Sequence, residues 1–485
     1  MLLAELVRGL NITNDEGYGD IEIKGVAYDS RKVGKGYVFV CIDGMTTDGH
    51  DYACEALEKG AAALIVQKDI GITGKTTVLR TDDTRKALAH VSDRFYGHPS
   101  GRFRLIGITG TKGKTTTTFM IKAILEAAGR KVGLIGTLGT RIGERELHSE
   151  HTTPESLELQ MLFSEMAEEG VDEVVMEVSS QGLALQRVGA CEFDTAVFTN
   201  LSRDHIGEKE HASMEDYLLA KCKLFKMSRR GLVNLDSVFA SKVLEEAECA
   251  TLTFGMDERA DIRASAIVKM PQKVEFKIDS PWYGGKFSVN IPGRFSVYNA
   301  LASAGVSGLF GVPQEIVQKG LEQVHVPGRA ELVDTGRNFS VIIDYAHTPD
   351  SLENILSTVG DYAAGRVICV FGCGGDRDRT KRPMMGAISA RLADYTVITS
   401  DNPRTEDPDS IIAQIEAGIK DEAVKYTCIR DRREAIRYAM REAGTGDVLV
   451  LAGKGHETYQ IFGDRTVHFD EREVVREILE EMNAY

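Results

Sequence analysis

Residues 104–129, RLIGITGTKGKTTTTFMIKAILEAAG, contain the pattern that decides the fold of this chain. An apolar run typical of a strand, with Leu105, Ile106 and Ile108, leads into a glycine-rich turn. Four threonines follow, and then apolar residues at helical spacing. Backbone amides in such a turn and at a helix N-terminus attract anions, and a lysine adds a full positive charge. The stretch therefore predicts a site for a nucleotide triphosphate.

The turn departs in one respect from the strict spacing of a P-loop. That spacing has a glycine five positions before Gly113, where this chain has Ile108, and Gly107 is one position early. A plain glycine turn beside a solvated lysine is the alternative interpretation. The order of strand, turn and helix favours the nucleotide site, in which Lys114 reaches the outer phosphates and Thr115 shares a Mg²⁺ ion.

Length and composition restrict the class of protein. A chain of 485 residues is too long for a single hydrophobic core, so we expect several domains. The formal net charge of −15 argues against nucleic acid as a partner. The eight cysteines form no C-x-x-C pair, and no apolar run is long enough to span a membrane. We therefore expect reduced thiols and a cytoplasmic protein without membrane insertion. We also expect a monomer, although no residue pattern in the sequence carries that expectation.

Two changes in composition divide the chain into three predicted domains. Residues 96–101 have the composition of a linker, and Pro327 and Gly328 mark a second boundary. Between them, strand, helix and strand in succession, with 131–140 as the next strand after the phosphate loop, predict an α/β fold with a parallel sheet. We also expect a hairpin around Gly284. The predicted domains are 1–99, 100–328 and 329–485.

Three further residues of the central part attract attention. The apolar stretch 174–178 contains one acid, Glu177, at the predicted carboxyl end of a strand, where Mg²⁺ ligands are usual near a phosphate loop. The alternative is a strand-end acid that faces water. His205 follows another apolar strand, and Lys221 lies in a helical stretch among apolar neighbours. By themselves these two residues predict only structural roles.

In the last third of the chain, polar residues and glycines follow each apolar strand. Open α/β sheets bind ligands at the carboxyl ends of their strands, so these positions predict a second part of the site. The residues are Asp344, His347, Arg377, Asp401, Asn402, Arg404, Gly453 and Glu457.

Over nearly its whole length the chain resembles the Mur ligases, because eight motifs occur in the order seen in that family. The motifs are TGTKGKTT, VVMEVSS, NLSRDH followed by AK, PGR, DYAHTPDSL, GCGGDRDR, DNPRTEDP and GKGHE. Within the family the chain most resembles the UDP-N-acetylmuramoyl-tripeptide synthetases. The resemblance implies three α/β domains: an N-terminal domain that binds the UDP precursor, a central P-loop ATPase domain with a parallel sheet, and a C-terminal Rossmann-like domain that holds the amino acid.

The resemblance also implies an ATP-dependent amide-bond ligase of peptidoglycan precursor synthesis, and thus a role in cell-wall biogenesis, cell shape and cell division. In the family, the D-glutamate carboxylate of UDP-N-acetylmuramoyl-L-alanyl-D-glutamate takes the γ-phosphoryl group of ATP. The amine of a diamino acid then displaces phosphate. The implied partners are ATP, this UDP-dipeptide and meso-diaminopimelate, and the implied cofactors are Mg²⁺ and a lysine carbamylated by CO₂.

Position by position, the resemblance implies three groups of residues for ATP, metal and UDP-dipeptide. The ATP group is Gly110, Thr111, Lys112, Gly113, Lys114, Thr115, Thr116, Asn299, Arg329, Asp344 and His347. The metal group is Thr115, Glu177, His205 and carbamylated Lys221, and the catalytic residues are Lys114, Glu177, His205 and Lys221. The UDP-dipeptide group is Ser30, Thr152, Thr153, Ser179 and Arg187.

The DNPR segment predicts which amino acid is added, since lysine-adding relatives lack its arginine. Meso-diaminopimelate has an extra carboxylate that Arg377 and Arg404 can each bind in bidentate fashion. L-Lysine would leave a buried arginine without a partner, at a cost of roughly 1–3 kcal/mol. An ordinary Asx-Pro turn is the alternative interpretation of this segment. The implied diaminopimelate group is Arg377, Asp401, Asn402, Pro403, Arg404, Gly453 and Glu457, with Asp401 and Glu457 for the ammonium.

The chain departs from the family at two places. Relatives often have DHLD-x-H where this chain has the longer DHIGEKEHASMEDY (204–217), so the motif aspartate is absent and Glu208, Glu210 or His211 takes another role. Gln181 stands where histidine is frequent. These changes leave the geometry of a second metal open.

Two other functions stay open. One is another amide ligase of the superfamily, such as a folylpolyglutamate synthase, although those enzymes begin close to their phosphate loop and this chain has a predicted domain before it. The other is a nucleotide-gated regulatory protein without catalysis. The joint presence of Lys114, Glu177, His205 and Lys221 disfavours it.

Overall fold

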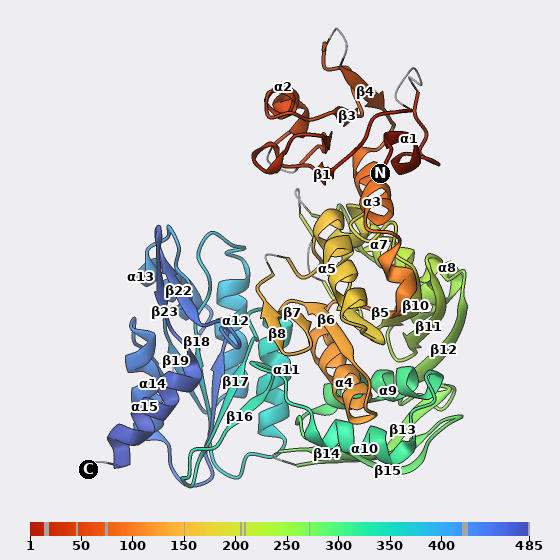
Figure 1. Ribbon diagram of the computed structural model, residues 1–485. Helices are drawn as coiled ribbons and strands as arrows, with labels where there is room; N and C mark the ends of the chain where they lie inside the picture. Colours follow the sequence, from red (N-terminus) through yellow and green to blue (C-terminus); the bar gives the residue numbers. More distant parts are fainter. Residues whose placement is uncertain are drawn as a thin grey trace. The chain divides into compact units, whose positions relative to one another are not determined.

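The computed structural model describes residues 1–13, 19–44, 47–72, 76–149, 151–203, 206–207, 210–270, 272–419 and 425–483 (Figure 1). Its contacts divide the chain into two compact units. The first comprises Met1–Arg263, Ser280–Trp282 and Leu301–Gly320. The second comprises Ala264–Asp279, Tyr283–Ala300 and Leu321–Tyr485.

The first sheet of the first unit has four parallel strands in sequence order. Val38 and Val40 pack into one hydrophobic cluster and Phe39 into another, because alternate residues of a strand face opposite sides of the sheet. Both faces are therefore covered, as is usual for parallel sheets. The elements are α1 (Leu3–Leu6), β1 (Gly25–Ala27), η1 (Ser30–Lys32), β2 (Tyr37–Val40), η2 (Gly49–Tyr52), α2 (Ala53–Glu58), β3 (Ala63–Val66), β4 (Thr77–Arg80) and α3 (Thr84–Phe95).

A larger sheet carries the phosphate loop, and within the first unit its strand order is β12-β11-β10-β5-β9-β6-β7-β8. The run from β12 to β6 is parallel, and β7 and β8 add an antiparallel edge. The strands are β5 (Arg104–Thr109), β6 (Val132–Gly136), β7 (Gly139–Ile142), β8 (Arg145–Leu147), β9 (Glu173–Glu177), β10 (Phe193–Phe198), β11 (Ser228–Asn234) and β12 (Ala250–Gly255). The other elements are η3 (Pro99–Arg102), α4 (Lys114–Ala127), α5 (Ser156–Glu168), α6 (Ser180–Ala184), α7 (Met214–Lys226) and α8 (Ala240–Glu246).

The register of this sheet positions the site. Ile108 of β5 lies opposite Glu177 of β9, and Thr109 lies opposite Phe198 of β10. Three parallel strands therefore end side by side, and the loops that follow them meet at one edge. The predicted parallel sheet is confirmed.

The stretch 131–140 is not the single strand that the sequence predicted. It forms β6 and β7, which pair antiparallel. Gly139 adopts φ 100, a left-handed conformation that glycine reaches without strain, and this permits the reversal.

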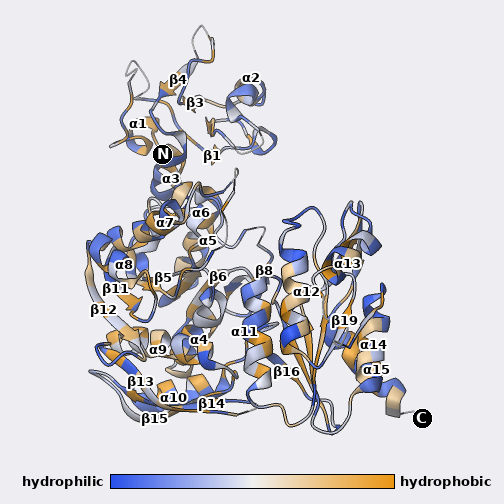
Figure 2. Cartoon of the chain, turned by 180° about the vertical axis from the view of Figure 1, so that it is seen from behind, coloured by the Kyte–Doolittle hydropathy of each residue, from blue (hydrophilic) through white to orange (hydrophobic). Residues whose placement is uncertain are grey.

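The second unit contains a six-stranded sheet of order β16-β17-β21-β18-β19-β20, in which only β16 is antiparallel to its neighbour. In Figure 2 its strands are coloured as hydrophobic, whereas α11 and α12 carry both colours, as amphipathic helices do. The six strands are β16 (Glu331–Val333), β17 (Ser340–Asp344), β18 (Val367–Phe371), β19 (Tyr395–Ile398), β20 (Tyr426–Cys428) and β21 (Val448–Ala452). A separate antiparallel pair consists of β22 (Tyr459–Phe462) and β23 (Arg465–His468). The helices are α11 (Pro349–Gly360), α12 (Lys381–Leu392), α13 (Pro408–Glu416), α14 (Arg432–Glu442) and α15 (Glu471–Asn483).

The predicted hairpin around Gly284 is confirmed, because β14 (Val274–Asp279) and β15 (Gly284–Val289) pair antiparallel. The remaining elements are β13 (Ile262–Lys269), α9 (Arg294–Leu309) and α10 (Gln314–Gln323). Asn299, which the resemblance assigns to the ATP group, lies inside α9. No helix in the described part of the chain combines the length and hydropathy that a membrane span requires.

Candidate functional site

The phosphate loop connects β5 to α4 through two glycines in left-handed or related conformations, Gly110 with φ 146 and Gly113 with φ 84. A Cβ on Gly110 would lie 2.0 Å from Thr199 Oγ1, so only glycine fits there. Gly113 is the N-cap of α4, and the amides of the first helical turn have no acceptor within the helix. The loop thus offers an anion site at the helix N-terminus.

Residues that follow β10 hold the loop in shape. Asn200 accepts hydrogen bonds from the amides of Thr111 (2.9 Å, to its carbonyl O) and Lys112 (3.0 Å, to Oδ1). Its Nδ2 donates to Lys112 O at 3.0 Å. The amides of Thr111 and Lys112, which belong to the predicted phosphate cradle, therefore donate to Asn200 and stabilise the loop conformation. The sequence of the loop alone does not reveal these bonds.

Two lysines meet at this loop. Lys114 Nζ donates to Gly110 O and Thr111 O, both at 2.9 Å. Lys221 Nζ, from α7, also donates to Gly110 O at 2.9 Å. Lys221 is buried, and its Nζ lies 4.4 Å from the centroid of the Tyr217 ring. Lys221 therefore contacts the phosphate loop and does not lie on a solvated helix face.

Glu177 is the buried carboxylate of the site. Its Oε1 accepts from Thr115 Oγ1 (3.0 Å) and from the Thr137 amide (2.9 Å), and its Oε2 accepts from Thr137 Oγ1 (3.2 Å). Thr115 and Glu177, which the sequence assigned to one Mg²⁺ ion, are thus in direct contact. Carboxylate and hydroxyl oxygens are the hard ligands that Mg²⁺ prefers, so the donor set fits this ion. Sequence reasoning missed Thr137, which lies in an unremarked turn between β6 and β7.

Another of the four expected metal ligands, His205, lies outside the described residues, as do Asp204 and Glu208. Within the described part, no group of three or more His, Cys, Asp and Glu side chains is arranged to hold a metal. His211 is described: its Nδ1 is 3.0 Å from Asp216 Oδ2, and its ring centroid lies 5.1 Å from that of Tyr217. The altered loop therefore brings His211 to the aromatic ring that contacts Lys221.

Four of the five expected dipeptide ligands gather beside Glu177. Thr152 Oγ1 is 3.0 Å from Thr137 Oγ1, and Thr153 Oγ1 donates to Glu177 O at 3.0 Å. Thr153 Oγ1 also accepts from the Ser179 amide, and Thr153 O accepts from Arg187 Nη1. The fifth, Ser30, is buried in η1, where its carbonyl accepts from Lys59 Nζ at 3.1 Å.

Arg187 has a carboxylate partner that the sequence did not single out. Its Nε lies 2.9 Å from Glu155 Oε1, and Glu155 Oε2 lies 3.5 Å from Arg85 Nη1. Glu155 thus orients Arg187 and links it to α3.

In the second unit, three of the four expected nucleotide residues surround Tyr345. Arg329 lies over its ring, with Cζ 4.8 Å from the centroid, and the His347 ring centroid is 4.5 Å away. Asp344 Oδ2 accepts from the Ala330 amide at 2.7 Å. Burial raises the pKa of Asp344, and the nearby Arg329 opposes that rise. The fourth, Asn299, is buried in α9.

The side-chain amide of the DNPR segment meets the acid of the GKGHE segment. Asn402 Nδ2 donates to Glu457 Oε2 at 2.8 Å. Asp401 Oδ1 accepts from the Asn402 amide, whereas its buried Oδ2 accepts no hydrogen bond from the described residues. A Cβ on Gly453, which has φ 112, would lie 2.9 Å from that Oδ2. A buried carboxylate oxygen without a donor is a strong reason to expect a cationic ligand.

The side chains of the two expected carboxylate-binding arginines both pass close to Gly374, Arg404 with its guanidinium and Arg377 with its aliphatic stem. A Cβ placed there would lie 3.0 Å from Arg404 Nη1 and 3.8 Å from Arg377 Cγ. Arg377 is exposed and Arg404 half-buried, with Arg404 Nη1 donating to Gly375 O at 2.8 Å. The Arg404 backbone has φ 52, an uncommon conformation for a side chain of this size.

A buried ion pair anchors the strands that carry this part of the site. Arg432 and Glu471 are fully buried, with Nη2 2.7 Å from Oε1. Arg432 Nη2 also donates to Ala452 O at 2.8 Å, directly before Gly453. Burial raises the pKa of Glu471, and Arg432 opposes that rise.

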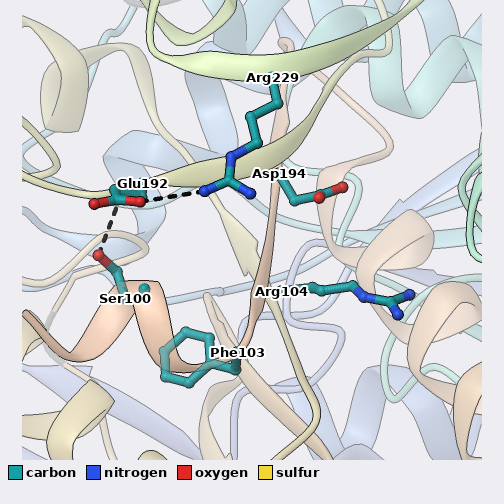
Figure 3. A pocket seen from close by; sticks show the side chains of 7 residues that line it. Ser100, Phe103, Arg104, Glu192, Asp194 and Arg229 are labelled. Carbon is teal, nitrogen blue, oxygen red and sulfur yellow. Dashed lines mark hydrogen bonds and ion pairs between the residues drawn. The ribbon is translucent and has the colours of Figure 1, made fainter.

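A small polar pocket lies at the opposite edge of the central sheet (Figure 3). Glu192 and Asp194 mark the start of β10, and Arg104 begins β5. Because the phosphate loop follows the other end of β5, this pocket does not belong to the candidate site. Its lining residues are Ser100, Gly101, Phe103, Arg104, Glu192, Asp194 and Arg229.

Comparisons with known proteins agree with this architecture. Three family models match: the Mur ligase family, catalytic domain, over residues 22–96; the Mur ligase middle domain over 108–307; and the Mur ligase, glutamate ligase domain, over 328–455. A solved structure of a UDP-N-acetylmuramoyl-L-alanyl-D-glutamate–2,6-diaminopimelate ligase has a TM-score of 0.75 and 30% identity, and the alignment covers 100% of this chain and 99% of that one. The expected fold of three α/β domains is confirmed, while the exact bounds 1–99, 100–328 and 329–485 stay a prediction.

Curated relatives extend over the whole chain. A UDP-N-acetylmuramoyl-L-alanyl-D-glutamate–2,6-diaminopimelate ligase from Caldanaerobacter subterraneus subsp. tengcongensis is 50% identical over 482 residues, which are 99% of each chain. The ligase of the same name from Clostridium botulinum is 48% identical over 467 residues, which are 95% of this chain and 96% of the relative.

Proposed function

The chain belongs to the Mur ligase family, and we propose that it is an ATP-dependent ligase that joins meso-diaminopimelate to UDP-N-acetylmuramoyl-L-alanyl-D-glutamate in peptidoglycan precursor synthesis. One observation in the structure carries the proposal. Contacts run without a break from Lys114 and Thr115 through Glu177 to Thr153 and Arg187. In this proposal the triphosphate site adjoins the site for the anionic dipeptide, whose carboxylate accepts the phosphoryl group and then acts as the acyl donor.

The chemistry explains why such a pair of sites is needed. A carboxylate acylates amines poorly, so its oxygen first takes the γ-phosphoryl group and ADP departs. The amine nitrogen then attacks the acyl carbon, phosphate departs, and the nitrogen loses a proton. Lys114 and the amides of the first turn of α4 bind the triphosphate and stabilise its charge during transfer. Arg187, held by Glu155 and Thr153, orients the acidic dipeptide.

Thr115 and Glu177 would hold Mg²⁺, with His205 as a further ligand. The ion neutralises phosphate charge when it is bound. The buried hydrogen bond from Thr115 Oγ1 to Glu177 Oε1 supports the assignment of these two residues to one ion.

We further propose that Lys221 is carbamylated. Lys114 and Lys221 donate to the same carbonyl oxygen, which limits their nitrogens to a separation of about 6 Å. Two ammonium groups at that distance repel by roughly 3 kcal/mol at an effective dielectric constant of about 20. In the modification the ammonium first loses a proton, a bond then forms between Nζ and the carbon of CO₂, and the nitrogen loses a second proton, so two protons are released in all. The resulting carbamate is an anion beside Lys114 and offers oxygen donors to a metal.

The choice of meso-diaminopimelate rests on the second unit. The side chains of Arg377 and Arg404 both lie beside Gly374, and their guanidinium groups would bind the extra carboxylate, which L-lysine lacks. The unpartnered Asp401 Oδ2 would accept the ammonium of the same centre.

We also propose that the reaction takes place in the cytoplasm and that the enzyme is a monomer. All eight cysteines are free, as expected in a reducing compartment. Light scattering of the purified chain at working concentration tests the monomer, and a dimer mass would contradict it.

Phosphate release with ATP and the UDP-dipeptide tests the proposed function. We expect turnover with meso-diaminopimelate and at least about tenfold less with L-lysine. Equal turnover with lysine would overturn the specificity. Turnover that depends on a pterin substrate would instead support a folylpolyglutamate synthase, and ATP binding without phosphate release would support a regulatory protein.

A further inference from the structure

A lysine to which nothing so far assigns a role lies at the centre of the second part of the site. The side chain of Lys454 is fully buried, although its neighbours in sequence are two glycines that leave space around it. Burying an ammonium group is unfavourable unless acceptors surround it. The position of Lys454 therefore requires partners, and these are residues of the site.

Lys454, Asn402 and Glu457 form a closed triangle of hydrogen bonds. Lys454 Nζ donates to Glu457 Oε2 at 3.0 Å and to Asn402 Oδ1 at 3.3 Å. Asn402 Nδ2 donates to the same Glu457 Oε2 at 2.8 Å. Both contacts of Glu457 in the triangle use Oε2, so the triangle fixes the direction of Oε1.

The triangle also fixes the orientation of the Asn402 amide. Asn402 Oδ1 accepts from Lys454 Nζ and from the Ile461 amide at 3.1 Å, which assigns oxygen to that side and the NH₂ group to Glu457. Two further bonds join the same segments: Gln460 Nε2 donates to Asp401 O at 2.8 Å, and the Arg404 amide donates to Ile461 O at 3.0 Å. The segments 401–404 and 454–461 therefore hold each other.

Lys454 also sets the net charge of the side chains around it. Asp401 and Glu457 are both acidic, and Asp401 Oδ2 is buried without a donor among the described residues. With Lys454 the three side chains carry one net negative charge, which matches one ammonium group. Without Lys454 they would carry two, and the carboxylates would repel.

We infer that Lys454 is a positioning residue for the amino-acid substrate: it holds Asn402 and Glu457 in place and sets the charge of the site to that of one incoming ammonium. This inference rests on the proposed function. It predicts an effect on the diamino acid and not on ATP, because Lys454 donates hydrogen bonds to Asn402 and Glu457 and, among the described residues, to no member of the ATP group.

The test is steady-state phosphate release by the full-length chain, with KM measured separately for meso-diaminopimelate, ATP and the UDP-dipeptide. We expect Lys454→Met to raise KM for meso-diaminopimelate at least tenfold while KM for ATP stays within twofold. Lys454→Arg, which keeps the charge, should restore part of the loss. Exposed Lys425, in the same unit, provides the matched control Lys425→Met, which should leave every constant unchanged.

A double-mutant cycle separates positioning from general damage. If Lys454 acts through Glu457, Lys454→Met should add less than threefold to the KM effect of Glu457→Gln. Full additivity, an unchanged KM for meso-diaminopimelate, or an equal rise in KM for ATP would each overturn the inference. If Lys454→Met does not fold, Lys454→Arg carries the test, since unchanged constants in that variant would also contradict it. A wild-type chain without diaminopimelate-dependent turnover would instead refute the proposed function.

Discussion

Lys114 and Lys221, from two different helices, donate hydrogen bonds to one acceptor, the carbonyl oxygen of Gly110, each at 2.9 Å. The acceptor belongs to the glycine that the approach of Thr199 makes irreplaceable. The loop is thus held from both sides by cationic groups. A modification that reverses one of the two charges would convert repulsion into attraction, which makes Lys221 the first residue to test.

Substitution of Lys221 should discriminate between an ammonium and a carbamate. We expect Lys221→Met to lower kcat at least about 100-fold, because the site loses a group that faces developing charge. Lys221→Glu, which supplies a permanent carboxylate, should retain more activity than Lys221→Arg. Lys223→Met, on the exposed face of the same helix, is the control. Peptide mass spectrometry in bicarbonate buffer should find one added CO₂ on Lys221. Full activity of Lys221→Arg would contradict the carbamate.

Glu177→Gln keeps the shape of the side chain and removes its charge. The amide still reaches Thr115 and Thr137, so folding should change little. We expect kcat to fall about 100- to 1,000-fold and the Mg²⁺ concentration for half-maximal activity to rise. Activity titrations with Mg²⁺ measure both effects, with exposed Glu168→Gln as the control. A fall in kcat at an unchanged Mg²⁺ requirement would count against a metal ligand.

Gly136→Ala should disturb the site more than the fold. A Cβ at Gly136 would lie 2.4 Å from Glu177 Oε1, so the carboxylate must move away from Thr115. We expect a loss of about 1 kcal/mol in unfolding free energy and at least a tenfold fall in kcat. Gly284→Ala, where a Cβ meets nothing within 4 Å, is the control for both measurements. Wild-type kcat in Gly136→Ala would show that the exact position of Glu177 is unimportant.

Arg404→Ala should reduce the preference for meso-diaminopimelate. The substrate would lose a bidentate partner for its extra carboxylate, so we expect its KM to rise about 10- to 100-fold. Turnover with L-lysine, which has no such carboxylate, should not fall. Arg465→Ala, an exposed arginine of β23, is the control. An equal loss with both amino acids would assign Arg404 to the loop structure and not to specificity.

The ion pair of Arg382 and Glu406 should make stability depend on pH. Arg382 is fully buried, and its hydrogen bonds lower the pKa of Glu406 from 4.5 to about 2. A lowered pKa in the folded state stabilises the protein above pH 4.5, and this contribution is lost as the pH falls towards 2. Glu406→Gln should therefore destabilise the chain clearly at pH 7 and much less at pH 3, as measured by urea denaturation.

The control for this effect is Glu353→Gln. Glu353 pairs with Arg391 at the surface, where both side chains are largely exposed, and such pairs contribute little. Its unfolding free energy should follow that of the wild type at both pH values. A Glu406→Gln variant that is equally destabilised at pH 7 and pH 3 would disprove the linkage.

Sequence patterns predicted the parts of the site that depend on local order along the chain. A strand, a glycine turn and a helix must place amides at the helix N-terminus, and an acid at the end of a neighbouring parallel strand must lie at the same edge. Glu177 does lie opposite Ile108 in the register of β5 and β9. The same reasoning placed Asn402 and Glu457 at a second sheet edge, where their side chains are hydrogen-bonded.

Contacts between distant segments could not be predicted in this way. Thr137 reaches Glu177 because β6 reverses into β7, and no periodicity in the sequence signals that turn. Lys454 stands in the GKGHE motif, but its complete burial depends on Asn402, which lies on another strand end. β4 and α3 were also missed, although Asp83 caps α3 in the ordinary way and could have revealed it.

The left-handed backbone at Arg404 has an evolutionary consequence. A long side chain in that conformation costs roughly 1 kcal/mol, whereas glycine or asparagine adopts it readily. A lineage that exchanged this arginine for one of those residues would lose recognition of a carboxylate and at the same time relax its main chain. A change of substrate preference at this turn therefore needs no compensating substitution elsewhere. The arginine persists only where selection for its charge outweighs the stability that glycine or asparagine would add.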